Sequence, residues 1–139
     1  MTHVFKTVGS TQIEVDIYCA QHLVPGSTLP PIFVALHGGA WIGGNRKEFN
    51  AALIDALLKR GFLVASFDYR LLPESSFVKG QLEDVRSIEA WVKKDLPRLL
   101  NCRPAQSILV GGQSAGALLA LLTVCIDNSD REDERADSV

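Results

Sequence analysis

This chain of 139 residues has few cysteines, no excess of basic charge and no cluster of metal-ligand residues. Its three cysteines, Cys19, Cys102 and Cys125, are far apart and lack a C-x-x-C spacing, which excludes a disulfide framework and a zinc site. We expect free thiols and no bound metal. The formal net charge of −2 excludes the basic face that nucleic acids require, so we expect no nucleic-acid partner.

Long apolar segments are also missing. The longest apolar run, Ala115 to Ile126, is shorter than the ~20 residues that a bilayer requires, so it predicts a buried helix and no membrane span. The N-terminus lacks the apolar segment of a secretory signal, which makes the cytoplasm the expected compartment. A hydrophobic content of 47% supports one packed domain over residues 1–127, and the polar, acidic residues 128–139 predict a solvated tail.

The pattern of apolar residues predicts two kinds of strand. Val4 to Val8 and Ile13 to Tyr18 alternate apolar and polar residues around Gly9, which predicts a hairpin of two half-exposed edge strands. Later runs are continuously apolar, as is typical of parallel strands that are covered on both faces. These runs are Ile32–Leu36, Phe62–Phe67 and Ser107–Val110.

Two helical patterns lie between the apolar runs. The first starts at a capping box, Asn45 to Glu48, and ends at Gly61. Its apolar residues Phe49, Leu53 and Leu57 recur at four-residue spacing. The second presents one apolar face before Pro97, formed by Leu82, Val85, Ile88, Val92 and Leu96. Strands that alternate with helices predict an α/β fold with a mostly parallel sheet, an antiparallel hairpin at its N-terminal side and helices on both faces.

A G-x-S-x-G motif, Gly112 to Gly116, lies directly between the last predicted strand and the last predicted helix. In this position Ser114 occupies a sharp turn that exposes its hydroxyl, and the small flanking residues avoid a collision. The N-terminus of the following helix favours the negative charge that develops during acyl transfer. The alternative interpretation is a glycine-rich turn whose serine has no catalytic role.

Two further segments follow predicted strands. His37-Gly38-Gly39-Ala40-Trp41 follows the first apolar run, where glycines let backbone N–H groups face a ligand, as in an oxyanion hole. The alternative is a flexible turn with a capping histidine and a core tryptophan. The segment Asp68 to Glu74 follows the second run and by itself reads as a polar loop in which Arg70 and Glu74 pair.

In this order and spacing, HGGAW, DYRLLPE and GQSAG resemble the hormone-sensitive-lipase-like branch of the α/β-hydrolase family. The resemblance spans Val4 to Ile126 and covers the N-terminal half of the family's fold. It implies hydrolysis of small carboxylic esters through an acyl-enzyme, without a cofactor. The residue roles that it implies are a nucleophile, Ser114; oxyanion-hole amides at Gly38, Gly39, Ala40 and Ala115; and structural support from His37, Tyr69, Arg70 and Glu74.

A complete catalytic triad is not present in this sequence. In α/β-hydrolases the order is Ser, then Asp or Glu, then His, yet all three histidines, His3, His22 and His37, precede Ser114. Loss of the histidine costs about 10⁶ in turnover, so slight activity is expected unless His37 approaches the serine hydroxyl within about 3 Å. We therefore expect a fold cut short after the nucleophile helix.

Other functions remain open at this stage. The same serine chemistry serves amides and peptides, and some members of the family, such as gibberellin receptors, bind small molecules without hydrolysis. An inert fragment is the third alternative. The strand Ser107–Val110 would then be an uncovered apolar edge, which favours self-association.

Overall fold

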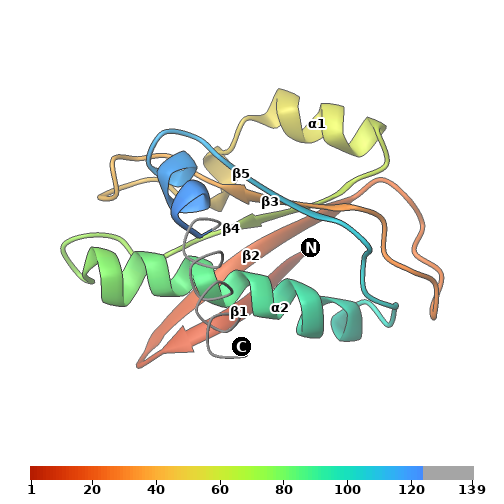
Figure 1. Ribbon diagram of the computed structural model, residues 1–139, viewed down its shortest axis with the longest axis horizontal. Helices are drawn as coiled ribbons and strands as arrows, with labels where there is room; N and C mark the ends of the chain where they lie inside the picture. The colour runs from red at the N-terminus through yellow and green to blue at the C-terminus, as the bar shows by residue number, and fades with distance from the viewer. Residues whose placement is uncertain (124–139) are drawn as a thin grey trace, which may run out of the picture.

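A computed structural model describes residues 1–123 and contains a five-stranded mixed sheet with helices on both faces (Figure 1). The strand order is β1-β2-β4-β3-β5. The predicted acidic tail, Cys125 and the C-terminal end of the apolar run to Ile126 lie outside the described residues. The proposed domain limit at residue 127 therefore stays a prediction.

The N-terminal hairpin is confirmed, but only one of its strands is an edge. β1 (Thr2–Val8) pairs antiparallel with β2 (Thr11–Cys19), and β2 also pairs antiparallel with β4. The prediction of two edge strands is wrong for β2, because the polar residues in its alternating pattern do not all face water. Asp16 is buried, accepting a hydrogen bond from Thr2 and lying 3.2 Å from Arg46 Nε.

The three continuous apolar runs form the parallel part of the sheet, as predicted. β3 (Ile32–Leu36) pairs in parallel with both β4 (Leu63–Phe67) and β5 (Ile108–Gly112). Every residue of β4 is buried. β5 lies at the edge of the described sheet, as expected, and is partly exposed.

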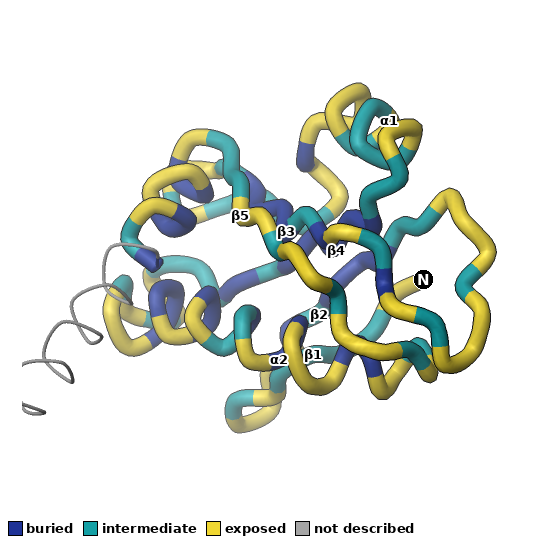
Figure 2. Tube along the Cα trace, turned by 45° about the vertical axis from the view of Figure 1, so that its right-hand side comes forward, coloured by how far each residue is buried: buried dark blue, intermediate teal, exposed yellow. Residues whose placement is uncertain are grey.

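The two helical patterns cover opposite faces of the sheet. α1 (Ala51–Lys59) packs on one face, whereas α2 (Glu83–Leu99) packs on the other (Figure 1). The larger core cluster joins alternate residues of β3 to α2 and to Leu119 and Ala120 of the helix at 115–123. The smaller cluster lies under α1, whose trace is exposed or intermediate along its length (Figure 2).

The first predicted helix is divided in two. Asn45 caps a short 3-10 helix, Arg46–Glu48, and the chain is then extended at Phe49 before Asn50 caps α1. The break arises because Phe49 is buried in the smaller core cluster, which shifts the register of the helix. As a result Leu53 of the predicted apolar repeat is exposed, whereas Leu57 of that repeat packs on the sheet together with Ile54 and Leu58.

The second helical pattern is confirmed over its buried face, with two differences. A π-helix, Phe77–Leu82, precedes α2, and α2 continues past Pro97 to Leu99. It ends where Leu100 donates to the carbonyl of Leu96 and Asn101 adopts a φ of 51°.

Within residues 1–123, no helix combines the length and the apolar character needed to cross a membrane. Over the same residues, no group of three or more His, Cys, Asp or Glu side chains is placed to hold a metal ion.

Candidate active site

The site lies at a topological switch point of the sheet. β3 and β5 are parallel neighbours, but β3 leads towards α1 on one face and β5 leads into the helix at 115–123 on the other. Ligands of α/β sheets bind in the crevice that such divergence creates at the carboxyl ends of the strands. The amide of Gln113 donates to the carbonyl of Leu36 at 3.0 Å, which ties the two strand ends together.

Ser114 occupies a sharp elbow between β5 and the following helix. Its φ is +50°, a left-handed conformation that is unusual for a residue other than glycine, and its side chain is exposed. Close backbone contact makes glycine necessary at both ends of the motif. A methyl group on Gly116 would lie 2.4 Å from the carbonyl oxygens of Leu36 and His37, and one on Gly112 would lie 2.2 Å from the carbonyl carbon of Gly116.

The loop after β3 approaches this elbow directly. A methyl group on Gly38 would lie 3.1 Å from the carbonyl oxygen of Gln113 and 3.4 Å from Cβ of Ser114. The structure thus brings together the two glycine-containing loops, each of which the sequence placed at the end of a predicted strand. Gly39 and Ala40, the next residues of the loop, are exposed.

Four amides at this junction have no acceptor. Within residues 1–123, no hydrogen bond is formed by the backbone N–H groups of Gly38, Gly39, Ala40 or Ala115. The next amide of the elbow, that of Gly116, donates to Gln113. Unpaired donors beside an exposed hydroxyl are what a developing oxyanion requires.

His37 lies beneath the loop and is 1% exposed. Its Nδ1 lies 2.6 Å from the carbonyl oxygen of Gly38 and must donate the hydrogen, because a carbonyl only accepts. The imidazole stacks on Tyr69, with ring centroids 4.3 Å apart, and the Tyr69 hydroxyl donates to the His37 carbonyl at 2.9 Å. Burial raises the pKa of Tyr69 to about 12, so the phenol remains a neutral donor. The burial of His37 itself beneath the loop disfavours this histidine as a general base.

Arg70 pairs with Asp84 and not with Glu74, so the predicted Arg70–Glu74 pair is wrong. Glu74 is exposed in a turn, whereas the fully buried carboxylate of Asp84 accepts from Arg70 Nε and Nη2, both at 2.8 Å, and from the Arg70 amide at 3.0 Å. Lys6 Nζ lies 2.9 Å from the same carboxylate. Burial alone would raise the pKa of Asp84, but hydrogen bonds from Arg70 and Lys6 outweigh it and hold the pKa below its usual value.

The carbonyl of Trp41 anchors the far end of the loop. It accepts hydrogen bonds from the amide of Leu72 at 2.9 Å and from Nε2 of Gln81 at 2.7 Å. Ala40 and Trp41 have φ values of 51° and 65°, which cost about 1–2 kcal/mol each for L-residues. The two hydrogen bonds, at a net 0.5–1.5 kcal/mol each, offset a comparable amount.

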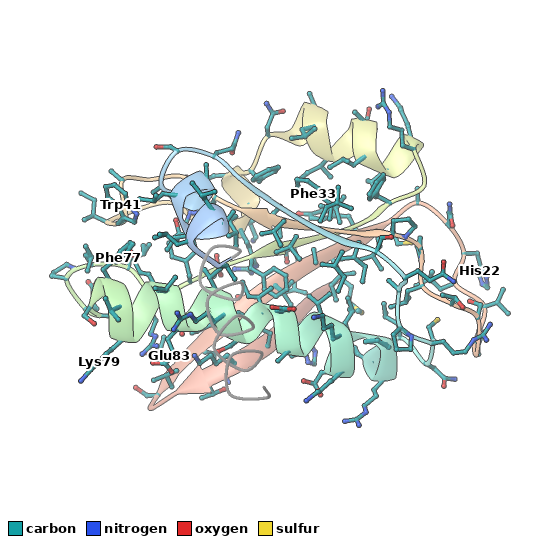
Figure 3. All side chains as sticks on the ribbon, in the orientation of Figure 1. His22, Phe33, Trp41, Phe77, Lys79 and Glu83 are labelled. Atoms are coloured by element: carbon teal, nitrogen blue, oxygen red, sulfur yellow. The ribbon has the colours of Figure 1, made fainter. Side chains whose placement is uncertain are left out.

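Gln81 was missed in the sequence, although a signal was present. It precedes Val85 by four residues and Ile88 by seven, which places a lone amide on the apolar face of the helical pattern. The Trp41 ring lies against Phe77 of the same π-helix in an edge-to-face contact (Figure 3).

An ionic cluster fixes the chain just beyond the loop. Arg46 contacts three carboxylates, those of Glu14, Asp16 and Asp68, at 2.6 to 3.2 Å, and its amide also donates to Asp68. Desolvation by burial would lower the pKa of Arg46, but the hydrogen bonds that it donates to Asp68 and Asp16 raise the pKa overall.

Known structures share this fold. The apo form of Thermogutta terrifontis esterase 2 superposes with a TM-score of 0.74 at 24% sequence identity, over 86% of this chain and 44% of that chain. The propionate-bound form of the same esterase gives the same TM-score and identity. At this identity the likeness establishes the α/β-hydrolase fold.

Sequence relatives are segments of much larger enzymes. The non-reducing polyketide synthase adrD of Penicillium rubens is 36% identical over 118 residues, which is 81% of this chain and 5% of the synthase. The non-reducing polyketide synthase ausA of Aspergillus calidoustus is 37% identical over 115 residues, 79% of this chain and 5% of the synthase. The family model BD-FAE matches residues 15–139. The chain therefore belongs to the BD-FAE family and has the α/β-hydrolase fold.

Proposed function

We propose that this domain hydrolyses carboxylic esters with Ser114 as the nucleophile. One observation carries the proposal: Ser114 stands exposed on a left-handed elbow, beside a glycine loop whose amides have no acceptor in residues 1–123. The fold shared with an esterase supports it. The order of the three motifs, HGGAW, DYRLLPE and GQSAG, supports the narrower assignment to the hormone-sensitive-lipase-like branch.

In the proposed reaction the Ser114 hydroxyl attacks the ester carbonyl carbon. The carbonyl oxygen becomes an oxyanion and accepts hydrogen bonds from the amide of Ala115 and from amides of the loop at Gly38, Gly39 and Ala40. Collapse of this intermediate releases the alcohol and leaves an acyl-enzyme, which water then hydrolyses. A single oxyanion donor typically contributes a factor of about 10²–10³ in turnover.

When the Ser114 hydroxyl attacks, its proton must pass to a base, and we propose that this base is a histidine held by an Asp or Glu, as in the family's triad. His37 is buried beneath the loop, and no histidine follows Ser114 in the sequence. The chain spans 44% of the esterase 2 chain. For His37, Tyr69, Arg70 and Glu74 we propose structural roles, and Glu74 has the weakest support because it is exposed.

Similarity to polyketide synthases favours a second candidate function. Segments of these synthases are up to 37% identical to this chain, so the acyl group taken by Ser114 would come from a synthase intermediate and not from a free ester. The same nucleophile and oxyanion donors serve both reactions. Amide hydrolysis and receptor-like binding have no comparable observation in their favour.

A fluorophosphonate probe tests the role of Ser114 in the full chain. Esterase 2 is phosphorylated by paraoxon and phosphonylated by cyclosarin, which supports this choice of reagent. We expect one equivalent of probe on Ser114, none on Ser114→Ala, and unchanged labelling of Ser107→Ala, which removes another exposed hydroxyl near the same strand. Equal labelling of Ser114→Ala, or none of the unmodified chain, would overturn the proposal.

We also propose that the chain self-associates through β5. The carbonyl of Ser107 accepts a hydrogen bond from the amide of Ile32, and the amide of Gln113 donates to the carbonyl of Leu36. Alternate residues of β5 therefore bond to β3, and the backbone N–H and C=O groups of the residues between them, Ile108 and Val110, point away from β3. The strand carries no charged residue, and Leu109 and Val110 are exposed. Unprotected edges of this kind pair with other chains.

A further inference from the structure

The carbonyl of Trp41 is held from two directions. The amide of Leu72 reaches it from the loop after β4, and Nε2 of Gln81 reaches it from the π-helix. Gln81 is fully buried and lies 40 residues further along the chain. Its side chain therefore has no role on the surface and acts inside the protein on the loop that approaches Ser114.

The conformation of this loop depends on being held. Ala40 and Trp41 are consecutive L-residues in the left-handed region, a strained arrangement that persists only where the surroundings enforce it. The first residue of the loop is fixed by the hydrogen bond from Tyr69 to the His37 carbonyl. Leu72 and Gln81 fix its last residue, and the unpaired amides lie between these two anchors.

The π-helix is itself secured in a way that positions Gln81. Arg70 Nη2 donates to the carbonyl of Lys79 at 3.3 Å and lies 3.5 Å from that of Gly80, while the Asp84 carboxylate holds the guanidinium. Ser76 caps the first turn by accepting from the amide of Lys79. A π-turn is rare and is frequently found at functional sites, which fits a segment that must aim one side chain inward.

We propose that Gln81 is a positioning residue for the oxyanion loop. It holds Trp41, and through Trp41 the left-handed turn at Ala40, so that the loop amides face Ser114. This proposal rests on the proposed esterase function, but it concerns the geometry of the loop, which can be measured separately from catalysis.

The test replaces Gln81 with methionine, which has a similar length but no N–H donor, and uses Gln106→Met as a matched control at an exposed position. Hydrogen exchange is followed at the amides of Ile42 and Gly43, which both donate to the carbonyl of Gly39. In Gln81→Met we expect exchange at these amides to accelerate at least about fivefold, with exchange in β4 unchanged. Unchanged exchange at Ile42 and Gly43 would overturn the proposal.

A second readout is the rate at which the fluorophosphonate labels Ser114. We expect Gln81→Met to be labelled about tenfold more slowly at saturating probe, with unchanged half-saturation, because the loop donates to the reacting oxygen and not to the rest of the probe. An equal labelling rate in Gln81→Met and Gln106→Met counts against positioning. If the unmodified chain is not labelled, the esterase proposal fails, while the exchange data still decide the role of Gln81.

If Gln81→Met does not fold, hydrogen exchange in the unmodified protein tests the role of Gln81. The side-chain amide of Gln81 and the backbone amide of Ile42 are then expected to be protected to a similar degree, within about threefold, because one local opening exposes both. A Gln81 amide that exchanges freely while Ile42 stays protected would show that the loop keeps its shape without this contact.

Discussion

His37 and Tyr69 lie face to face, with an interplanar angle of 5°, and the Tyr69 hydroxyl donates to the His37 backbone carbonyl. The same tyrosine thus fixes both the side chain and the backbone of the residue that starts the glycine loop. Because His37 is buried and its Nδ1 bonds to Gly38, the histidine is part of the support of the loop.

Removal of the Tyr69 hydroxyl tests this support. We expect Tyr69→Phe to lower the free energy of unfolding by about 1 kcal/mol in urea denaturation, since the ring stack is kept and one buried hydrogen bond is lost. Because burial raises the pKa of Tyr69 to about 12, its contribution is present below the ordinary pKa of 10 and is lost as the pH rises towards 12. Tyr69→Phe should lack that alkaline loss, and an identical alkaline profile would contradict the assignment.

The Asp84 carboxylate predicts an acid-dependent loss of stability. Its folded pKa lies below the ordinary value of 3.8, so its contribution is present above about pH 4 and is lost as the pH falls further. At pH 7 we expect Asp84→Asn to destabilise the chain by about 3 kcal/mol, because the half-buried cations Lys6 and Arg70 lose their partner. Asp95→Asn, an exposed change on the same helix, is expected to stay within about 0.5 kcal/mol.

The variant Asp84→Asn should also flatten the dependence of stability on pH below pH 4. Some dependence will remain, because the pKa of Asp16 is also lowered. Burial would raise the pKa of Asp16, but the hydrogen bonds that it accepts from Thr2 and Arg46 outweigh this effect. Chemical denaturation at several pH values measures both slopes. Parallel slopes for the variant and the unmodified chain would show that Asp84 does not titrate in this range.

The left-handed conformation of Ser114 predicts that the elbow lowers the stability of the chain when it carries a residue other than glycine. Ser114→Gly and Ser114→Ala both remove the hydroxyl, but only glycine adopts a φ of +50° without strain. We expect the glycine variant to be more stable than the alanine variant by about 1 kcal/mol in thermal or urea unfolding. Equal stabilities would mean that the elbow relaxes once the hydroxyl is gone.

The edge strand β5 predicts concentration-dependent association. Leu109→Lys places a charge on the open edge and should shift the chain towards monomer in sedimentation velocity. Leu53→Lys is the matched control, because Leu53 is exposed to a similar extent, 42% against 46%, but lies on α1. A monomeric unmodified chain, or an equal effect of both variants, would contradict association through β5.

The sequence predicted the parts of the fold that depend on local patterns. The continuous apolar runs identified β3, β4 and β5 because strands buried on both faces tolerate few polar residues. The elbow at Ser114 was predictable because steric crowding at Gly112 and Gly116 leaves glycine as the residue that fits there.

The errors arose where distant contacts override local pattern. Burial of Phe49 divides the first helix, and Arg46 makes the polar face of β2 an internal surface. Arg70 pairs with Asp84, 14 residues away on another element, and not with its nearer neighbour Glu74. Gln81 reaches the Trp41 carbonyl only through the packing of α2 against the sheet, which residue spacing alone does not determine.

The ion pair between Lys6 and Asp84 affects where the N-terminal boundary of a stable domain can be placed. The family model begins at residue 15, so β1 lies outside the matched region even though Lys6 supplies one of the two cations that neutralise the buried carboxylate. Excision at the boundary of the match would leave that carboxylate with Arg70 alone. The first strand therefore contributes to the stability of the folded domain, and its removal would weaken the packing of the segment that carries Arg70 and Gln81.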